Sequence, residues 1–227
     1  MAYLLENVVP WGRNFNEYKK MFQLTDEDLL NKIIGFGDGP ASFNCEASKL
    51  GYKVTSLDPI YQFSGENIEK RIIEIKDIVI EQTKNNANNY VWTELKNLDE
   101  LERVRMSAMK TFLDDYEKGK SENRYIYHEL PQKTPFDDQT FDLGLSSHFL
   151  LMYTSLGYDF HIKSINEMLR LCKEIRIFPI VDLDAKESKI TNKVIEYFKN
   201  NYIVNIISTS YEFQKGGNLM LSIKNMP

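Results

Sequence analysis

The stretch "NKIIGFGDGPASFNCEASKLGYKVTSLDPIY", residues 31–61, decides the fold of this chain. Two short apolar runs, at 33–36 and 54–57, flank a glycine-rich turn and a segment with helical character. Short apolar runs bounded by turn residues are typical of buried strands. The expected elements are a strand over 32–36, a helix over about 41–50 that Gly51 ends, and a second strand over 53–57.

The rest of the chain alternates strands and helices around one long helical segment. Residues 65–120 carry two apolar stripes at helical spacing, one of which includes Arg105, with a break at the asparagine-rich stretch 86–89. This segment far exceeds the usual link between neighbouring strands, so we expect an inserted helical subdomain or lid. The other expected elements are a helical arm over 1–30, strands over 124–130, 141–147 and 174–181, helices over about 162–171 and 187–199, and two strands in the tail joined by a turn at Gly216 and Gly217.

This order of elements predicts a single α/β domain over residues 1–227. The length suits one full domain. Strands that alternate with helices, followed by two strands close in sequence, are typical of a doubly wound sheet with an antiparallel edge.

The composition limits the functions open to the chain. The formal net charge of −5 argues against a non-specific nucleic-acid binder, because such a protein presents a basic face. Cys45 and Cys172 show no metal-binding or redox spacing, so we expect reduced thiols and no metal site. The sequence shows neither a signal peptide nor an apolar stretch of ~20 residues, so we expect a cytoplasmic protein without a membrane partner.

The glycine-rich turn and the acid after the second strand predict a ligand that carries a ribose. In an open α/β sheet, ligands bind beyond the carboxyl ends of the strands, where the strand order reverses. Glycines there let the backbone approach the ligand, and the helix that follows presents unpaired N–H groups. Asp58, 19 residues after Gly39, lies where a carboxylate can accept both ribose hydroxyls.

The glycine spacing separates two kinds of ribose-bearing ligand. A dinucleotide fingerprint requires G-x-G-x-x-G, but its last position falls on Pro40 when counted from Gly35 and on Ser42 when counted from Gly37. The run G-x-G-x-G followed by Pro-Ala instead resembles the first motif of class I S-adenosylmethionine-dependent methyltransferases. In that family the glycine loop lies against the methionine part of the cofactor.

Two further segments carry the resemblance. "PFDDQTFDLGLSSHFLLMY", 135–153, is similar to the family's segment through strand four, and "INEMLRLCKEIRIFPI", 165–180, resembles the helix leading into strand five. With the tail, the matching pieces cover most of 31–61 and 124–181. The resemblance implies a Rossmann-like sheet of seven mostly parallel strands, the last antiparallel. The helical segment at 65–120 then falls between strands two and three as an insertion.

The chain departs from the family at two places. The family often has an acid two positions before the G-x-G core, where it anchors the cofactor's amino group, but this chain has Gly35 there. Asp38, inside the loop, is the candidate replacement. The insertion at 65–120 has no counterpart in the minimal fold, and we expect it to enclose the substrate together with the arm at 1–30.

The resemblance implies a set of site residues at the strand ends. His148 follows the strand that faces the transferred methyl group in this family, and with an unperturbed pKa near 6.5 it is either a general base or a structural histidine. Glu129 falls where the family contacts the adenine base, unless it is an ordinary solvated acid. The candidate cofactor-binding residues are Arg13, Gly35, Phe36, Gly37, Asp38, Gly39, Asp58, Pro59, Glu129, Ser146 and Ser147.

Other residues leave two interpretations open. Arg13, in the segment "PWGR", either pairs with the cofactor's carboxylate or is a solvated residue beside a packed aromatic. Tyr90, Trp92 and Tyr116 either line a substrate pocket or belong to the core, as aromatics at helical spacing more often do. His161, near the start of the next helix, is the other histidine considered for a catalytic role.

The resemblance implies methyl transfer from S-adenosylmethionine to an O, N or C atom of an acceptor. Proximity and in-line orientation can carry such a transfer, so no catalytic constellation is required. DNA amino-methylating members have [DNS]-P-P-[YF] after strand four, whereas this chain has "SSHF", so we expect a small-molecule acceptor rather than nucleic acid. Two other functions stay open: an NAD-dependent oxidoreductase, disfavoured by the missing third glycine, and a non-catalytic methyltransferase-like binding protein, favoured by Gly35.

Overall fold

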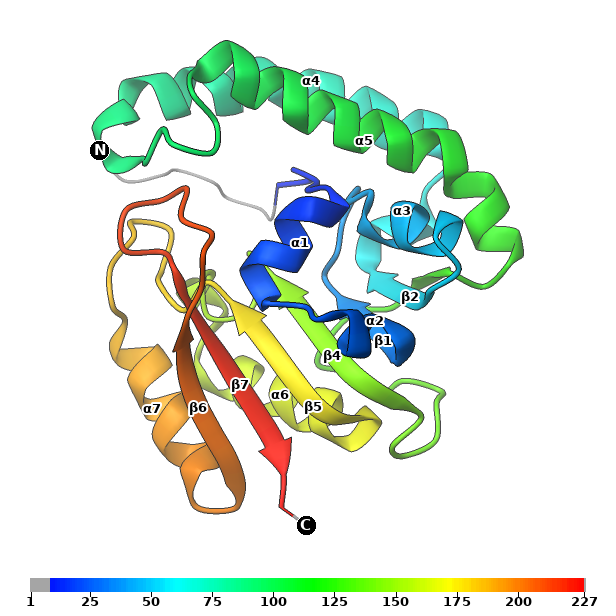
Figure 1. The fold of residues 1–227 in the computed structure, drawn as a ribbon, viewed down its shortest axis with the longest axis vertical. Helices are drawn as coiled ribbons and strands as arrows, with labels where there is room; N and C mark the ends of the chain where they lie inside the picture. Colours follow the sequence, from blue (N-terminus) through cyan, green and yellow to red (C-terminus); the bar gives the residue numbers. More distant parts are fainter. Residues whose placement is uncertain (1–8, 227) are drawn as a thin grey trace.

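The computed structural model describes residues 9–226, so residues 1–8 of the expected N-terminal arm lie outside the described residues. Seven strands form one sheet in the order β3-β2-β1-β4-β5-β7-β6 (Figure 1). All are parallel except β7, which is antiparallel to both of its neighbours. The strands are β1 (Lys32–Phe36), β2 (Lys53–Asp58), β3 (Tyr125–Tyr127), β4 (Phe141–Ser147), β5 (Cys172–Phe178), β6 (Tyr202–Ser208) and β7 (Leu219–Asn225).

Helices cover both faces of the sheet (Figure 1). Side chains alternate along a strand, so Ile33 of β1 packs in a core cluster with Tyr18 and Phe43, while Ile34 packs in the opposite cluster with Ile165. The first face carries α1 (Phe15–Phe22), α2 (Asp26–Leu30) and α3 (Phe43–Lys49), the second carries α6 (Tyr158–Leu171) and α7 (Lys189–Lys199), and α4 (Gly65–Asn85) and α5 (Leu98–Ser121) form the insertion. The predicted fold class, with its insertion between the second and third strands, is confirmed.

The insertion lies across the carboxyl ends of the strands, where α4 and α5 pack side by side (Figure 1). Apolar side chains of both helices form a cluster of their own with residues from β3 and from the turn after β2. The link between the two helices is tied to the β6–β7 loop. Val91 N donates to Phe213 O at 2.7 Å, and Lys215 N donates to Asn89 O at 2.9 Å. The insertion therefore forms a roof that is docked at both ends.

Two strands, β3 and β5, end three residues earlier than the sequence predicts. β5 ends at Phe178 because Pro179 has no N–H to donate into the ladder. β3 ends at Tyr127 because β2, its ladder partner, ends opposite it at Asp58. The chain then turns, with Gln132 N donating to the Glu129 carbonyl. Within residues 9–226 no helix combines the length and the apolar character needed to cross a membrane.

Candidate active site

A cavity of about 480 Å³ opens beyond the carboxyl ends of β1, β2 and β4, where the strand order reverses. Its walls come from the loop after β1, the turn after β2, the residues after β4, both insertion helices and the β6–β7 loop. A smaller cavity of about 160 Å³ adjoins it and shares Gly37, Pro59, Glu129 and Phe149. This is the place where open α/β sheets bind ligands.

The glycine loop and the end of β2 are in direct contact. Gly37 and Gly39 have φ angles of +69° and +53°, which favour glycine because a Cβ is strained in this region. Gly37 N donates to Leu57 O at 2.8 Å, and Gly39 N donates to Asp58 Oδ2 at 2.7 Å. Asp58 Oδ1 accepts from Ile60 N at 2.8 Å. The glycine turn and the Asp58 carboxylate, which the sequence analysis assigned to the same ligand, therefore lie side by side in the wall of the cavity.

Asp38 fills the space that Gly35 leaves open. A Cβ added to Gly35 would overlap the Asp38 carboxyl group. That carboxyl accepts from Tyr18 Oη at 2.9 Å and from Ser56 Oγ at 2.6 Å. Burial raises the pKa of Asp38 to about 7 and that of Asp58 to about 6. The carboxyl group of Asp38 thus occupies the space that a side chain at position 35 would fill.

His148 lies directly after β4 and faces the cavity in the neutral form. Its Nδ1 is 2.9 Å from Ser147 Oγ, and its Nε2 makes no hydrogen bond to the part of the chain described. Burial lowers the pKa of His148 well below its ordinary value, and the charges of Arg13 and Arg105 lower it further. A neutral imidazole with one unused nitrogen in a cavity can accept a proton.

Arg105 of α5 brings a buried charge to the roof of the cavity. Its Nη1 donates to both oxygens of Glu17, at 2.6 and 2.7 Å, and its Nη2 donates to Tyr211 Oη at 3.2 Å. Burial alone would raise the pKa of Glu17, but the charges of Arg105 and Arg13 hold it below its ordinary value. Arg105 therefore forms a buried ion pair with Glu17, and its hydrogen bond to the Tyr211 hydroxyl holds the guanidinium group in place.

Arg13 lies near this pair without a carboxylate of its own. Its Nη1 donates to the Trp11 carbonyl at 3.2 Å, and it forms no ion pair with any residue in 9–226. Its Nε is shielded from solvent and has no hydrogen-bond partner among those residues. Burial lowers the pKa of Arg13, and the charge of Arg105 lowers it further. Two guanidinium groups thus lie near one carboxylate, that of Glu17, which is paired with Arg105.

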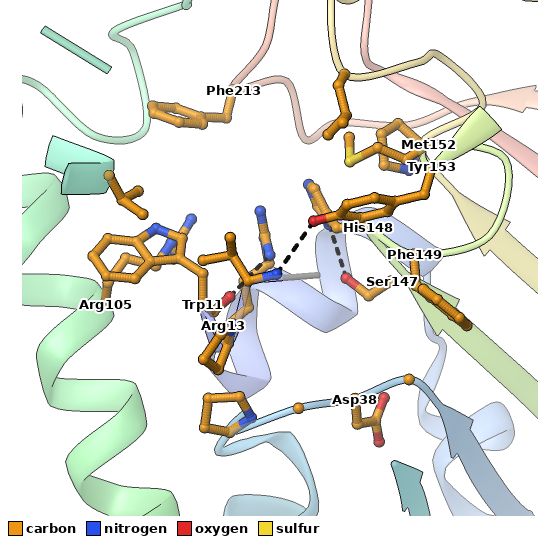
Figure 2. Close-up of a pocket in the computed structure, with 18 of the residues that line it drawn as sticks. Trp11, Arg13, Asp38, Arg105, Ser147, His148, Phe149, Met152, Tyr153 and Phe213 are labelled. Atoms are coloured by element: carbon orange, nitrogen blue, oxygen red, sulfur yellow. Dashed lines mark hydrogen bonds between the residues drawn. The ribbon is translucent and has the colours of Figure 1, made fainter. Parts of the chain in front are cut away.

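The charged residues divide the cavity into two halves. We call the acidic half the part lined by the glycine loop, Asp38, Asp58 and Glu129, and the basic half the part lined by Arg13, Arg105, His148, Tyr211 and Phe213. Figure 2 shows Arg13, Arg105 and His148 directed toward one space beneath Phe213, with Asp38 on the opposite side. Aromatic rings surround the basic half: Tyr90 stacks on Phe213 at 4.7 Å between ring centroids, and Trp11 and Tyr153 line the wall.

The structure brings most of the predicted site residues together. The large cavity is lined by Arg13, Gly37, Asp38, Gly39, Asp58, Pro59, Glu129, Ser147 and His148. Phe36 lines only the smaller cavity, while Gly35 and Ser146 line neither, the latter with its hydroxyl buried and unpartnered among the described residues. Of the residues with two interpretations, Tyr90 lines the cavity, whereas Trp92, Tyr116 and His161 do not.

Several lining residues were missed by the sequence reasoning. Arg105 had a signal, because it is the one charge in an otherwise apolar helical stripe and its position there predicts burial. Tyr211 and Phe213 had none, because nothing local indicates that the β6–β7 loop reaches the insertion. Tyr18 falls within the expected helical arm at 1–30, where its apolar spacing indicates a packed helix and not a contact with Asp38.

Comparison with known proteins gives one relative at high coverage. No family model matches the chain. Solved structures with a similar arrangement include PH0226 from Pyrococcus horikoshii (9% identity, 93% of this chain and 90% of that one, TM-score 0.49) and a TehB-like S-adenosylmethionine-dependent methyltransferase from Corynebacterium glutamicum (14%, 93% and 88%, TM-score 0.49). A likeness at these TM-scores says nothing about activity.

The uncharacterized protein MJ0045 of Methanocaldococcus jannaschii is 41% identical over 227 residues, which cover 99% of this chain and 100% of that protein. The chain belongs to the same family as MJ0045.

Proposed function

We propose that this chain is an S-adenosylmethionine-dependent methyltransferase that acts on a small molecule. One observation carries the proposal: Gly39 N and the Asp58 carboxylate meet at the base of a cavity located where the strand order reverses. A glycine turn and a carboxylate in contact at this place suit a ribose-bearing ligand.

The acidic half and the smaller cavity fit the adenosine part of the cofactor. Each Asp58 oxygen accepts one backbone N–H, so each keeps a lone pair for a ribose hydroxyl. The smaller cavity is lined mostly by apolar side chains, among them Leu57 and Phe160, and is suited to a flat base. Glu129 lies at the junction of the two cavities, where it can accept a hydrogen bond from an exocyclic amine.

The glycine loop fits the amino-acid part of the cofactor. A Cβ on Gly39 would meet nothing closer than Asp58 Oδ2 at 4.0 Å, so the space beside this residue is open. Asp38, in its buried position beside Gly35, is the acceptor proposed for the ammonium group. When bound, the cofactor supplies a methyl group already activated by its positive sulfur.

The chain's own residues orient the acceptor and remove its proton. His148 Nε2 is unpaired within the described residues, so it can accept the proton that the nucleophile loses. This requires the tautomer in which Nδ1 carries the proton and donates it to the hydroxyl oxygen of Ser147, 2.9 Å away. The roof formed by α4 and α5 limits access of water, and proximity supplies the remaining rate enhancement.

Protection against thermal unfolding tests this proposal against the oxidoreductase and the non-catalytic alternative. A ligand of the native state at one hundred times its Kd stabilises the chain by about 2.7 kcal/mol. We expect S-adenosylhomocysteine to raise the Tm and NAD(H) to leave it unchanged. Protection by NAD(H) alone would assign the site to a dinucleotide. Binding of neither would contradict the proposed function.

A further inference from the structure

The basic half of the cavity contains a positive charge that the described residues do not neutralise. Arg13 and Arg105 face the same space, and Glu17 is the one carboxylate that pairs with either of them in residues 9–226. The Nε atoms of both arginines are buried and lack hydrogen-bond partners there. Arg13 lines the cavity and has no carboxylate partner in residues 9–226, so this space is suited to an anionic ligand.

The direction of the arginines places this anion away from the glycine loop. Asp38, Asp58 and Glu129 all line the acidic half, whereas Arg13 and Arg105 point beneath Phe213 (Figure 2). The cofactor's adenosine and ammonium groups suit the acidic half, and its carboxylate, carried by the same carbon as the ammonium, would then lie beside the glycine loop. The anion of the basic half therefore belongs to the second ligand, the methyl acceptor.

The walls of the basic half indicate the shape of that acceptor. Trp11, Tyr90, Tyr153 and Phe213 line it, and Met152 lies beside Tyr153. Aromatic side chains provide flat apolar surfaces against which planar rings pack. A cavity with such walls and one cationic end is suited to a flat ring that carries a carboxylate.

We propose that the acceptor is a planar aromatic carboxylate, held by its carboxylate at Arg13 and by its ring among the aromatic side chains of the basic half. This inference rests on the proposed function. The guanidinium of Arg13 contacts the carboxylate in bidentate fashion, and Arg105 is a positioning residue that is itself held by Glu17 and Tyr211. The sequence had assigned Arg13 to the cofactor's carboxylate.

The reacting atom of the acceptor lies at the other end of the ring, near His148. The bond between sulfur and the methyl carbon breaks, and a bond forms between that carbon and a ring hydroxyl or amine. The nucleophile's proton passes to His148 Nε2 and then to solvent. The carboxylate takes no part in the bond changes and serves to orient the ring.

Binding to the chain saturated with S-adenosylhomocysteine tests the proposal. The probes are the three hydroxybenzoate isomers and the three matching hydroxybenzamides, which have the same shape without the charge. By calorimetry we expect at least one hydroxybenzoate to bind at least about tenfold more tightly than its amide, a difference of about 1.4 kcal/mol. Equal affinities, or no binding of any hydroxybenzoate, would overturn the proposal.

Substitution of Arg13 shows whether this residue binds the carboxylate of the acceptor or that of the cofactor. Arg13→Met should weaken hydroxybenzoate binding at least about tenfold, and Arg13→Lys should restore part of it. Arg103→Met, an exposed residue two positions before Arg105, is the matched control and should change nothing. Affinities for S-adenosylhomocysteine and for 5′-methylthioadenosine, which lacks the amino-acid part, should both be unchanged in Arg13→Met.

The two proposals fail in distinguishable ways. If Arg13→Met weakens S-adenosylhomocysteine but not 5′-methylthioadenosine, Arg13 binds the cofactor and the acceptor proposal is overturned, while the proposed function stands. If wild-type chain binds neither nucleoside, the proposed function itself has failed.

Discussion

The two halves of the cavity are built in different ways. The acidic half is mostly local: its glycine loop and Asp58 belong to one strand–helix–strand unit, and Gly39 is bonded to Asp58 only 19 residues away. The basic half joins distant parts of the chain, with Arg105 bonded to Glu17 across 88 positions and Tyr211 to Glu17 across 194. The fold itself therefore supplies the acidic half, while the arm, the insertion and the β6–β7 loop together define the basic half.

The largest expected effect on ligand binding concerns the acidic half. Gly37→Val places a Cβ 2.6 Å from the Phe149 ring, at a φ of +69° where side chains are strained. This strain costs about 1–3 kcal/mol and moves the loop from Asp58, so S-adenosylhomocysteine should bind at least about tenfold more weakly in calorimetry. Gly216→Ala, also at positive φ but with nothing within 4 Å, is the control for strain alone. Unchanged binding in Gly37→Val would mean that the ligand does not touch this loop.

The next effect concerns the basic half and is one of stability. Arg105→Met removes the partner of buried Glu17, and loss of one member of a buried ion pair costs about 3–5 kcal/mol. Urea unfolding should show this loss. The double substitution Arg105→Met with Glu17→Gln should recover much of it, because Glu17 no longer leaves a buried carboxylate without its partner. If the double variant were as unstable as the single one, the contribution of Arg105 to stability would come from packing and not from its charge.

A smaller effect is the pH dependence of stability that Asp38 of the acidic half produces. The pKa of Asp38 is raised to about 7 in the folded chain, so its contribution to stability is complete at low pH and is lost as pH rises through about 7. Between pH 5 and pH 8, wild type should lose on the order of 2 kcal/mol relative to Asp38→Asn, as measured by urea unfolding at both values. Parallel pH dependence of the two proteins would show that Asp38 is ionised throughout.

The smallest effect is on the roof of the basic half. Val91→Pro removes the N–H that donates to Phe213 O, a bond worth about 0.5–1.5 kcal/mol. Hydrogen exchange should accelerate in the α4–α5 link and the β6–β7 loop, with S-adenosylhomocysteine affinity unchanged. Val91→Ala keeps the N–H and serves as the control. Equal exchange in both variants would indicate that the roof is held by side-chain packing alone.

The same contrast explains what the sequence could predict. Periodicity and glycine spacing were enough for the sheet, the insertion and the placement of the glycine turn and Asp58 at the same ends of the strands, because these depend on local chemistry. The partners of Arg13 and Arg105 could not be predicted, since they depend on where α5 and the β6–β7 loop dock. Arg105 was visible as a charge in an apolar stripe, but the pattern does not name Glu17 as its partner.

A crystal structure of the chain with S-adenosylhomocysteine tests the central claim most directly. We predict both ribose hydroxyls within hydrogen-bonding distance of the Asp58 carboxylate, the amino-acid part against the glycine loop near Asp38, and the sulfur directed toward His148 and the basic half. Density for the ligand elsewhere, or a ribose that does not touch Asp58, would contradict the account.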